Sequence, residues 1–153
     1  MAKRTRFLAI ICMLSGLFAS YGILSGLVSA LSPPEVDSMF IDELLEQINR
    51  YELPIKDYSE DVESYYINLM VNFGNYGTAA FLFYSIQLIG VVLMYQLNRV
   101  GFALYVLAQI GLAAIPVLFG GLNEFSKLIF WATLSWNAVW IVMYATQLKY
   151  FRK

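Results

Sequence analysis

Residues 7–31 read FLAIICMLSGLFASYGILSGLVSAL, a stretch without one charged side chain. It is longer than the roughly 18–20 apolar residues that a helix needs to cross a bilayer. Its small residues recur at spacings of three and four, which places them on one helix face. They are Cys12, Ser15, Ala19, Gly22, Gly26 and Ser29. Since small side chains let a neighbouring backbone approach closely, we predict that this face packs against other helices of the chain.

Three further segments are long and apolar enough to cross a bilayer. They are residues 76–97, 100–122 and 127–148. The chain is 59% apolar and 14% charged, whereas a soluble domain is roughly 45–50% apolar and about 25% charged. The sequence therefore predicts an all-α, polytopic membrane protein. We expect a four-transmembrane-helix bundle that forms a single membrane domain over residues 1–153.

Charged residues are strongly segregated along the chain. Of the 11 acidic residues, all but Glu124 lie in an insertion, residues 32–75. The N-terminus, the turn at Arg99 and the C-terminal tail carry basic residues and no acidic ones. Lys and Arg near the ends of spans are retained on the cytoplasmic side. We therefore expect both termini in the cytoplasm and residues 32–75 on the extracytoplasmic side.

The insertion has the pattern of a small acidic helical hairpin. Ser32-Pro33-Pro34-Glu35 matches a capping box and opens a helix over about residues 33–50. A second cap at Asp57 opens another amphipathic helix, which Gly74 and Gly77 are predicted to end. The clustered acids offer ligands for Ca²⁺, but no spacing matches an EF-hand loop. We favour a solvated helix face and predict no metal site.

A competing interpretation makes residues 7–31 a cleaved signal peptide. Lys3 and Arg4 would form its basic start, and Val28-Ser29-Ala30 its small-residue cleavage site. The apolar region of a signal peptide is about 7–15 residues long, which is shorter than this stretch. The small-residue face also continues right through it, so a retained span is the favoured interpretation.

Uncharged polar residues recur inside the last three predicted spans. We take six as candidate ligand-binding residues: Tyr84, Gln87, Tyr105, Gln109, Asn137 and Tyr144. Facing a common axis, they would line a pocket for a lipid headgroup, a quinone-like ring or a small polar solute. The favoured alternative is structural, with hydrogen bonds between helices that contribute ~0.6–2 kcal/mol each. We also predict that the Asn137 and Tyr144 face of the fourth span packs into the small-residue groove of residues 7–31.

Several kinds of chemistry find no support in the sequence. The interiors of the four spans contain no Asp, Glu, Lys or Arg, which disfavours proton-coupled transport. The chain has no histidine, the commonest general base and transition-metal ligand. Cys12 is its only cysteine, which excludes chemistry by a cysteine pair. We interpret Cys12 as a packing residue and predict no enzyme activity, no cofactor and no nucleic-acid partner.

The layout of basic start, small-residue span, acidic insertion and three closely spaced spans resembles the many uncharacterised four-span small membrane proteins of bacteria. The resemblance covers the whole chain as an architecture, includes no diagnostic motif and transfers no functional residues. It implies the bacterial inner (plasma) membrane. We expect a non-enzymatic accessory or scaffold protein that assembles in the lipid bilayer with another membrane or extracytoplasmic protein, or with itself. The alternative is a lipid or small-solute binding or transport protein that uses the six polar residues.

Overall fold

The computed structural model describes residues 5–32, 46 and 59–151, and over these residues the regular structure is helical. The α-helices are Arg6–Leu31 (α1), Ser59–Val71 (α3), Phe73–Tyr95 (α4), Arg99–Gly120 (α5) and Glu124–Ala145 (α6), followed by a 3-10 turn, Leu148–Tyr150 (η2). Four of them, α1, α4, α5 and α6, are long and apolar enough to cross a membrane. The fold is consistent with a multi-pass membrane protein.

Side-chain caps begin three of the four long helices. Thr5, Asn98 and Asn123 precede α1, α5 and α6, and each accepts a hydrogen bond from a backbone N–H two or three residues further on. Such caps satisfy one of the N–H groups that the first turn of a helix leaves unpaired. Polar residues therefore define where each of these apolar helices starts.

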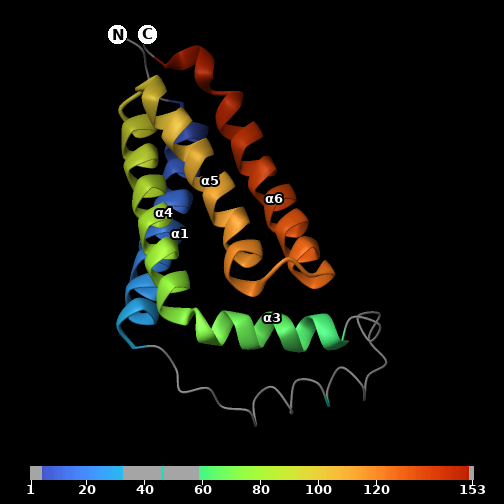
Figure 1. Ribbon diagram of the computed structural model, residues 1–153. Coiled ribbons are helices and arrows are strands. Elements are labelled where there is room, and N and C mark those ends of the chain that lie inside the picture. The colour runs from blue at the N-terminus through green and yellow to red at the C-terminus, as the bar shows by residue number, and fades with distance from the viewer. Residues whose placement is uncertain (1–4, 33–45, 47–58, 152–153) are drawn as a thin grey trace.

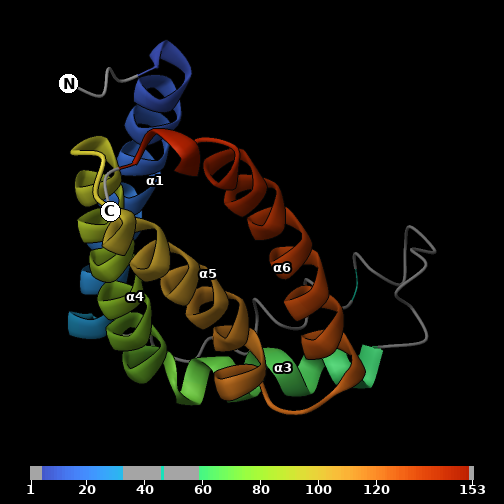
Figure 2. The same ribbon diagram turned by 90° about the horizontal axis from the view of Figure 1, so that it is seen from above.

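The long helices form an open arc in chain order. The helix α1 packs along α4, α4 along α5, and α5 along α6, as Figure 2 shows. The arc closes near one end only, where Tyr144 donates a hydrogen bond to the Ile11 carbonyl at 3.0 Å. At the same end the Thr5 hydroxyl donates to Gln147 Oε1 at 2.8 Å. The helix α3 lies across the opposite end, roughly perpendicular to the others (Figure 1).

The small-residue face of α1 seats α4. A Cβ atom added at Gly26 would lie 2.6 Å from the Phe81 nitrogen, and one at Gly77 would lie 2.5 Å from the Ala30 nitrogen. The ring of Tyr84 fills the space beside Gly22 in the same way. Only glycine permits such an approach of two helix backbones.

Two sequence predictions are corrected here. The face of α6 does not fill the groove of α1, because α4 carries its own glycine, Gly77, opposite Gly26 and the two backbones meet there. Gly74 and Gly77 do not end the second insertion helix, because the break between α3 and α4 lies at Asn72 and both glycines belong to α4. The helix predicted over about residues 33–50, and with it the hairpin, lies outside the described residues apart from residue 46.

The contact between α4 and α5 also depends on a pair of glycines. A Cβ at Gly90 would lie 2.9 Å from the Gly101 carbonyl oxygen, and one at Gly101 would lie 2.5 Å from that of Gly90. The connecting turn places Leu97 in the left-handed region, at φ 64°, with its side chain buried. The two helices therefore form a tight antiparallel pair, and α5 holds α6 away from α4.

Candidate functional site

The arc of helices surrounds a cavity of about 450 Å³. This volume lies within the roughly 300–1,000 Å³ of typical small-molecule sites. Five of the six candidate residues line it: Tyr84, Gln87, Tyr105, Gln109 and Asn137. They come from α4, α5 and α6, and α1 adds Ser15. The fold thus brings polar groups from four helices to one space.

The sixth candidate, Tyr144, is buried beside the cavity. Its ring makes an edge-to-face contact with Tyr105, with the centroids 4.7 Å apart. Its hydroxyl is engaged by the carbonyl of Ile11. Tyr144 therefore supports the wall at Tyr105 and joins α6 to α1, while Tyr105 itself faces the cavity.

The amide side chains that line the cavity differ in their hydrogen bonding. Asn137 Nδ2 donates a hydrogen bond of 3.0 Å to the backbone carbonyl of Gln109, which ties α6 to α5. Gln87 is only 5% exposed, and its Oε1 has no hydrogen-bond partner among the described residues. A buried acceptor without a partner costs about 1–3 kcal/mol. At this cavity, Gln87 Oε1 and Ser15 Oγ are buried polar atoms without a hydrogen-bond partner among the described residues, and a bound molecule could satisfy them.

The exposure of two lining residues, one on α1 and one on α6, points to a mouth of the cavity between these helices. Among its lining residues only Phe18 of α1 and Trp136 of α6 are largely exposed, at 61% and 63%. Trp140, one turn further along α6, packs edge-to-face on Phe18 with centroids 6.4 Å apart. Aromatic side chains thus frame a lateral opening, which the open arc leaves because α1 and α6 do not pack along their length.

The helix α3 covers the other end of the cavity. Tyr65 lines the cavity and packs edge-to-face on Phe125 of α6, with centroids 5.4 Å apart. Its ring also occupies the space beside Gly120, the last residue of α5. Burial of its phenol raises the pKa of Tyr65 to about 12, and the neighbouring Tyr76 and Tyr66 add to the effect.

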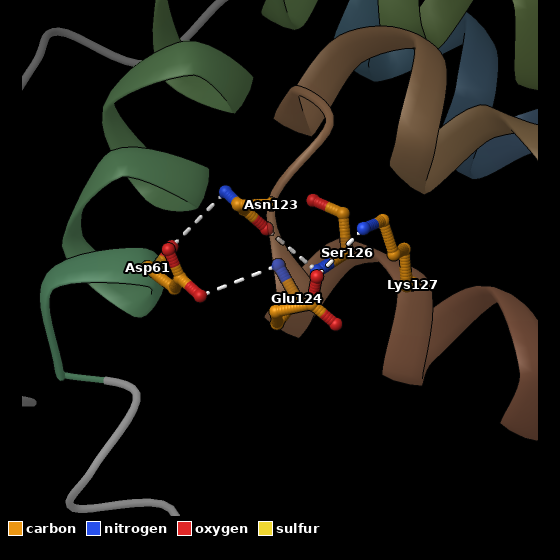
Figure 3. A network of polar contacts seen from close by, with 5 residues as sticks. All are labelled: Asp61, Asn123, Glu124, Ser126 and Lys127. Carbon is orange, nitrogen blue, oxygen red and sulfur yellow. Dashed lines mark hydrogen bonds and ion pairs between the residues drawn. The ribbon is translucent and has the colours of Figure 1, made fainter.

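Polar contacts hold α3 on the turn between α5 and α6 (Figure 3). The side chain of Asn123 donates to the backbone carbonyl of Asp61 at 3.2 Å while its Oδ1 caps α6. The Asp61 carboxylate accepts a 3.3 Å hydrogen bond from the backbone N–H of Glu124. A carboxylate at a helix N-terminus also interacts favourably with the helix dipole. Asn68 completes the contact by donating to the Gly120 carbonyl at 3.4 Å.

The predicted helix-packing residues are divided between two surroundings. Gly22, Gly26 and Ser29 lie against α4, and Ala19 is fully buried. Ser15 instead faces the cavity. Sequence reasoning missed Phe18, Tyr65 and Trp136 as lining residues. The sequence could not predict their place at the cavity, because an aromatic residue in an apolar helix has the same pattern at a cavity mouth as in a packed core.

The described residues that line the cavity carry no charge and include no group with obvious catalytic power. Among the described residues, no cluster of side chains is suited to hold a metal ion. The arrangement offers hydrogen bonds, apolar walls and aromatic faces, which are the means of holding an uncharged molecule. Comparison with protein-family models, with curated proteins and with solved structures found no match to this chain.

Proposed function

We propose that this chain is a multi-pass integral membrane protein that binds an uncharged lipid or small solute in its cavity. The observation that carries the proposal is the convergence of Tyr84, Gln87, Tyr105, Gln109 and Asn137 on one space of about 450 Å³. If these groups served packing alone, we would expect them to hydrogen-bond one another and leave no cavity, because buried polar atoms are normally hydrogen-bonded. Here a cavity remains, and Gln87 Oε1 has no hydrogen-bond partner within the described part of the chain.

The occupation of the small-residue face of α1 by α4 also favours the binding function over the accessory or scaffold function. An accessory or scaffold protein needs a face that is free for a partner, and the small-residue face of α1 is one candidate for it. Within the chain, α4 already occupies the face at Gly22 and Gly26. The other support for that function, the acidic insertion, falls largely outside the described residues.

We propose further that the protein lies in the inner (plasma) membrane of a bacterium with both termini in the cytoplasm. In the arc, Arg6, Arg99 and Lys149 lie at the end where α6 meets α1, and α3 with Glu60 lies at the other. Basic residues near span ends favour the cytoplasmic side. In a Cys12→Ala background, Lys149→Cys should react with an impermeant maleimide only from the cytoplasmic side. Glu60→Cys should react only from the opposite side, and the reverse pattern would invert the topology.

The binding proposal is tested by mass spectrometry of the protein purified in native lipid particles. The wild type should carry one defined uncharged molecule at near-stoichiometric amount. Thr133→Phe places a large side chain in the cavity and should remove this molecule. Ala132→Phe, its neighbour on the exposed face of α6, is the matched control and should retain it. A wild type that never carries a bound molecule, or a Thr133→Phe variant that keeps it, would contradict the proposal.

A further inference from the structure

We infer that the occupant of the cavity is a neutral lipid with a hydroxyl headgroup, which enters sideways between α1 and α6 and is recognised by Gln87. Diacylglycerols and isoprenoid alcohols share this chemistry. The inference rests on the proposed binding function and adds the class of the ligand, its route and its recognition residue.

The first step is the absence of charge. No described residue that lines the cavity is charged. Moving an ionised headgroup into such a space costs far more than burying a hydroxyl, because no opposite charge is there to offset its lost hydration. A phosphate, carboxylate or ammonium headgroup is therefore disfavoured, and the common phospholipids are disfavoured with it.

The second step is the hydrogen-bonding character of Gln87. A carboxamide offers an acceptor and donors together. Its Oε1 lacks a partner among the described residues, and the residue is only 5% exposed. A hydroxyl donates as well as accepts, so it can satisfy this oxygen, whereas a quinone carbonyl only accepts and leaves it unpaired. The geometry thus favours an alcohol over a quinone.

The third step is the position of the apolar opening. Phe18 and Trp136 at the mouth are exposed on the lateral surface of the apolar helices, where α1 and α6 do not pack along their length. The end under α3 is covered by Tyr65. A molecule with a polar head and an apolar tail therefore fits with its head at Gln87 and its tail leaving between α1 and α6. A water-soluble solute would instead need the covered end.

The experiment compares each alcohol with its own methyl ether, which cannot donate a hydrogen bond. The purified protein in phosphatidylcholine nanodiscs, with Trp131→Phe, keeps Trp136 and Trp140 as fluorescent reporters in the cavity wall. The probes are 1,2-dioctanoylglycerol, farnesol and their methyl ethers, with 2,3-dimethyl-1,4-naphthoquinone as the acceptor-only ring. We expect at least one alcohol to bind about tenfold more tightly than its ether. This ratio corresponds to about 1.4 kcal/mol of binding free energy for the hydrogen bond that the ether cannot donate. The two alcohols distinguish a diacylglycerol from an isoprenoid source.

Gln87→Leu should reduce the alcohol-to-ether ratio to below about twofold, and Thr78→Val on the exposed side of α4 should leave it unchanged. Equal affinity for alcohols and ethers, tighter binding of the naphthoquinone, or an unchanged ratio in Gln87→Leu would overturn the hydroxyl inference and leave the binding function standing. A wild type whose fluorescence responds to none of these probes overturns the inference as well. If native lipid particles also yield no bound molecule, the proposed function fails with it.

Discussion

Tyr144 of α6 donates a hydrogen bond to the backbone carbonyl of Ile11 in α1, across 3.0 Å. This contact joins the first and last long helices, which otherwise lie at the two ends of the arc. Both residues belong to a buried cluster that also contains Leu8, Met94 and Tyr105. The closed end of the arc therefore has a packed core, and the open part beyond it forms the cavity.

Tyr144→Phe should lower the free energy of unfolding by about 0.5–1.5 kcal/mol, because one buried hydrogen bond between helices is lost while the ring packing stays. Tyr144→Ala should cost about 3–5 kcal/mol, since a large buried ring is deleted. SDS-induced unfolding in mixed micelles measures both. Trp131→Phe, at an exposed ring, is the control and should stay within about 0.5 kcal/mol of the wild type. Equal losses in the two Tyr144 variants would disprove this view of the contact.

Gly26→Ala should destabilise the protein by roughly 1–3 kcal/mol, because the new methyl group would lie 2.6 Å from the Phe81 nitrogen and overpack the α1–α4 contact. Gly16→Ala is the matched control on the same helix. There the new Cβ would meet only Val91, at 3.9 Å, so the better helix propensity of alanine should make it neutral or stabilising by up to about 1 kcal/mol. SDS-induced unfolding measures both variants. A Gly26→Ala variant as stable as Gly16→Ala would refute the close approach of the α1 and α4 backbones.

The stability of the protein should fall above pH 10 because of Tyr65. An unfolded tyrosine ionises near pH 10, whereas burial raises the pKa of Tyr65 to about 12. Between these values the folded state keeps a proton that the unfolded state has lost. The stabilising contribution is therefore complete below pH 10 and is lost as the pH rises towards 12.

Unfolding free energies of the wild type and Tyr65→Phe, measured from pH 8 to 12, test this point. The wild type should lose stability relative to Tyr65→Phe across this interval, because phenylalanine has no proton to lose. Other tyrosines titrate in both proteins and cancel in the difference. Parallel curves would show that Tyr65 is not buried in the folded state.

Asn123→Ala should destabilise the docking of α3 as well as the start of α6. Its Oδ1 caps α6 and its Nδ2 reaches the Asp61 carbonyl. Asn98→Ala, at the start of α5, removes a cap without any contact to α3. Each cap is worth about 1 kcal/mol. Hydrogen exchange of the α3 amides should accelerate in Asn123→Ala and not in Asn98→Ala, and similar protection in both would contradict a role in docking.

The sequence alone predicted the long apolar helices, because their length and lack of charge are properties of each segment by itself. Their caps are also local: Asn98 and Asn123 lie directly before the apolar runs they start. The candidate set around Gln87 could be proposed from one property, polarity within an apolar helix. Whether those residues line a cavity or pair with one another is not a local property. In the structure Asn137 donates a hydrogen bond across helices, while Gln87 Oε1 has no partner among the residues that the structure describes.

The tertiary structure decided which helices are neighbours. The small-residue face of α1 accepts any helix that can approach closely, and the sequence pattern led us to predict α6 there. The contact goes to α4 because Gly77 lies opposite Gly26, so that two backbones meet where side chains are absent. Over the described residues, that pairing leaves α6 and the turn after it to contact α1 through Tyr144, Trp140 and Gln147. The cavity between them therefore depends on the packing of whole helices, which no single stretch of sequence specifies.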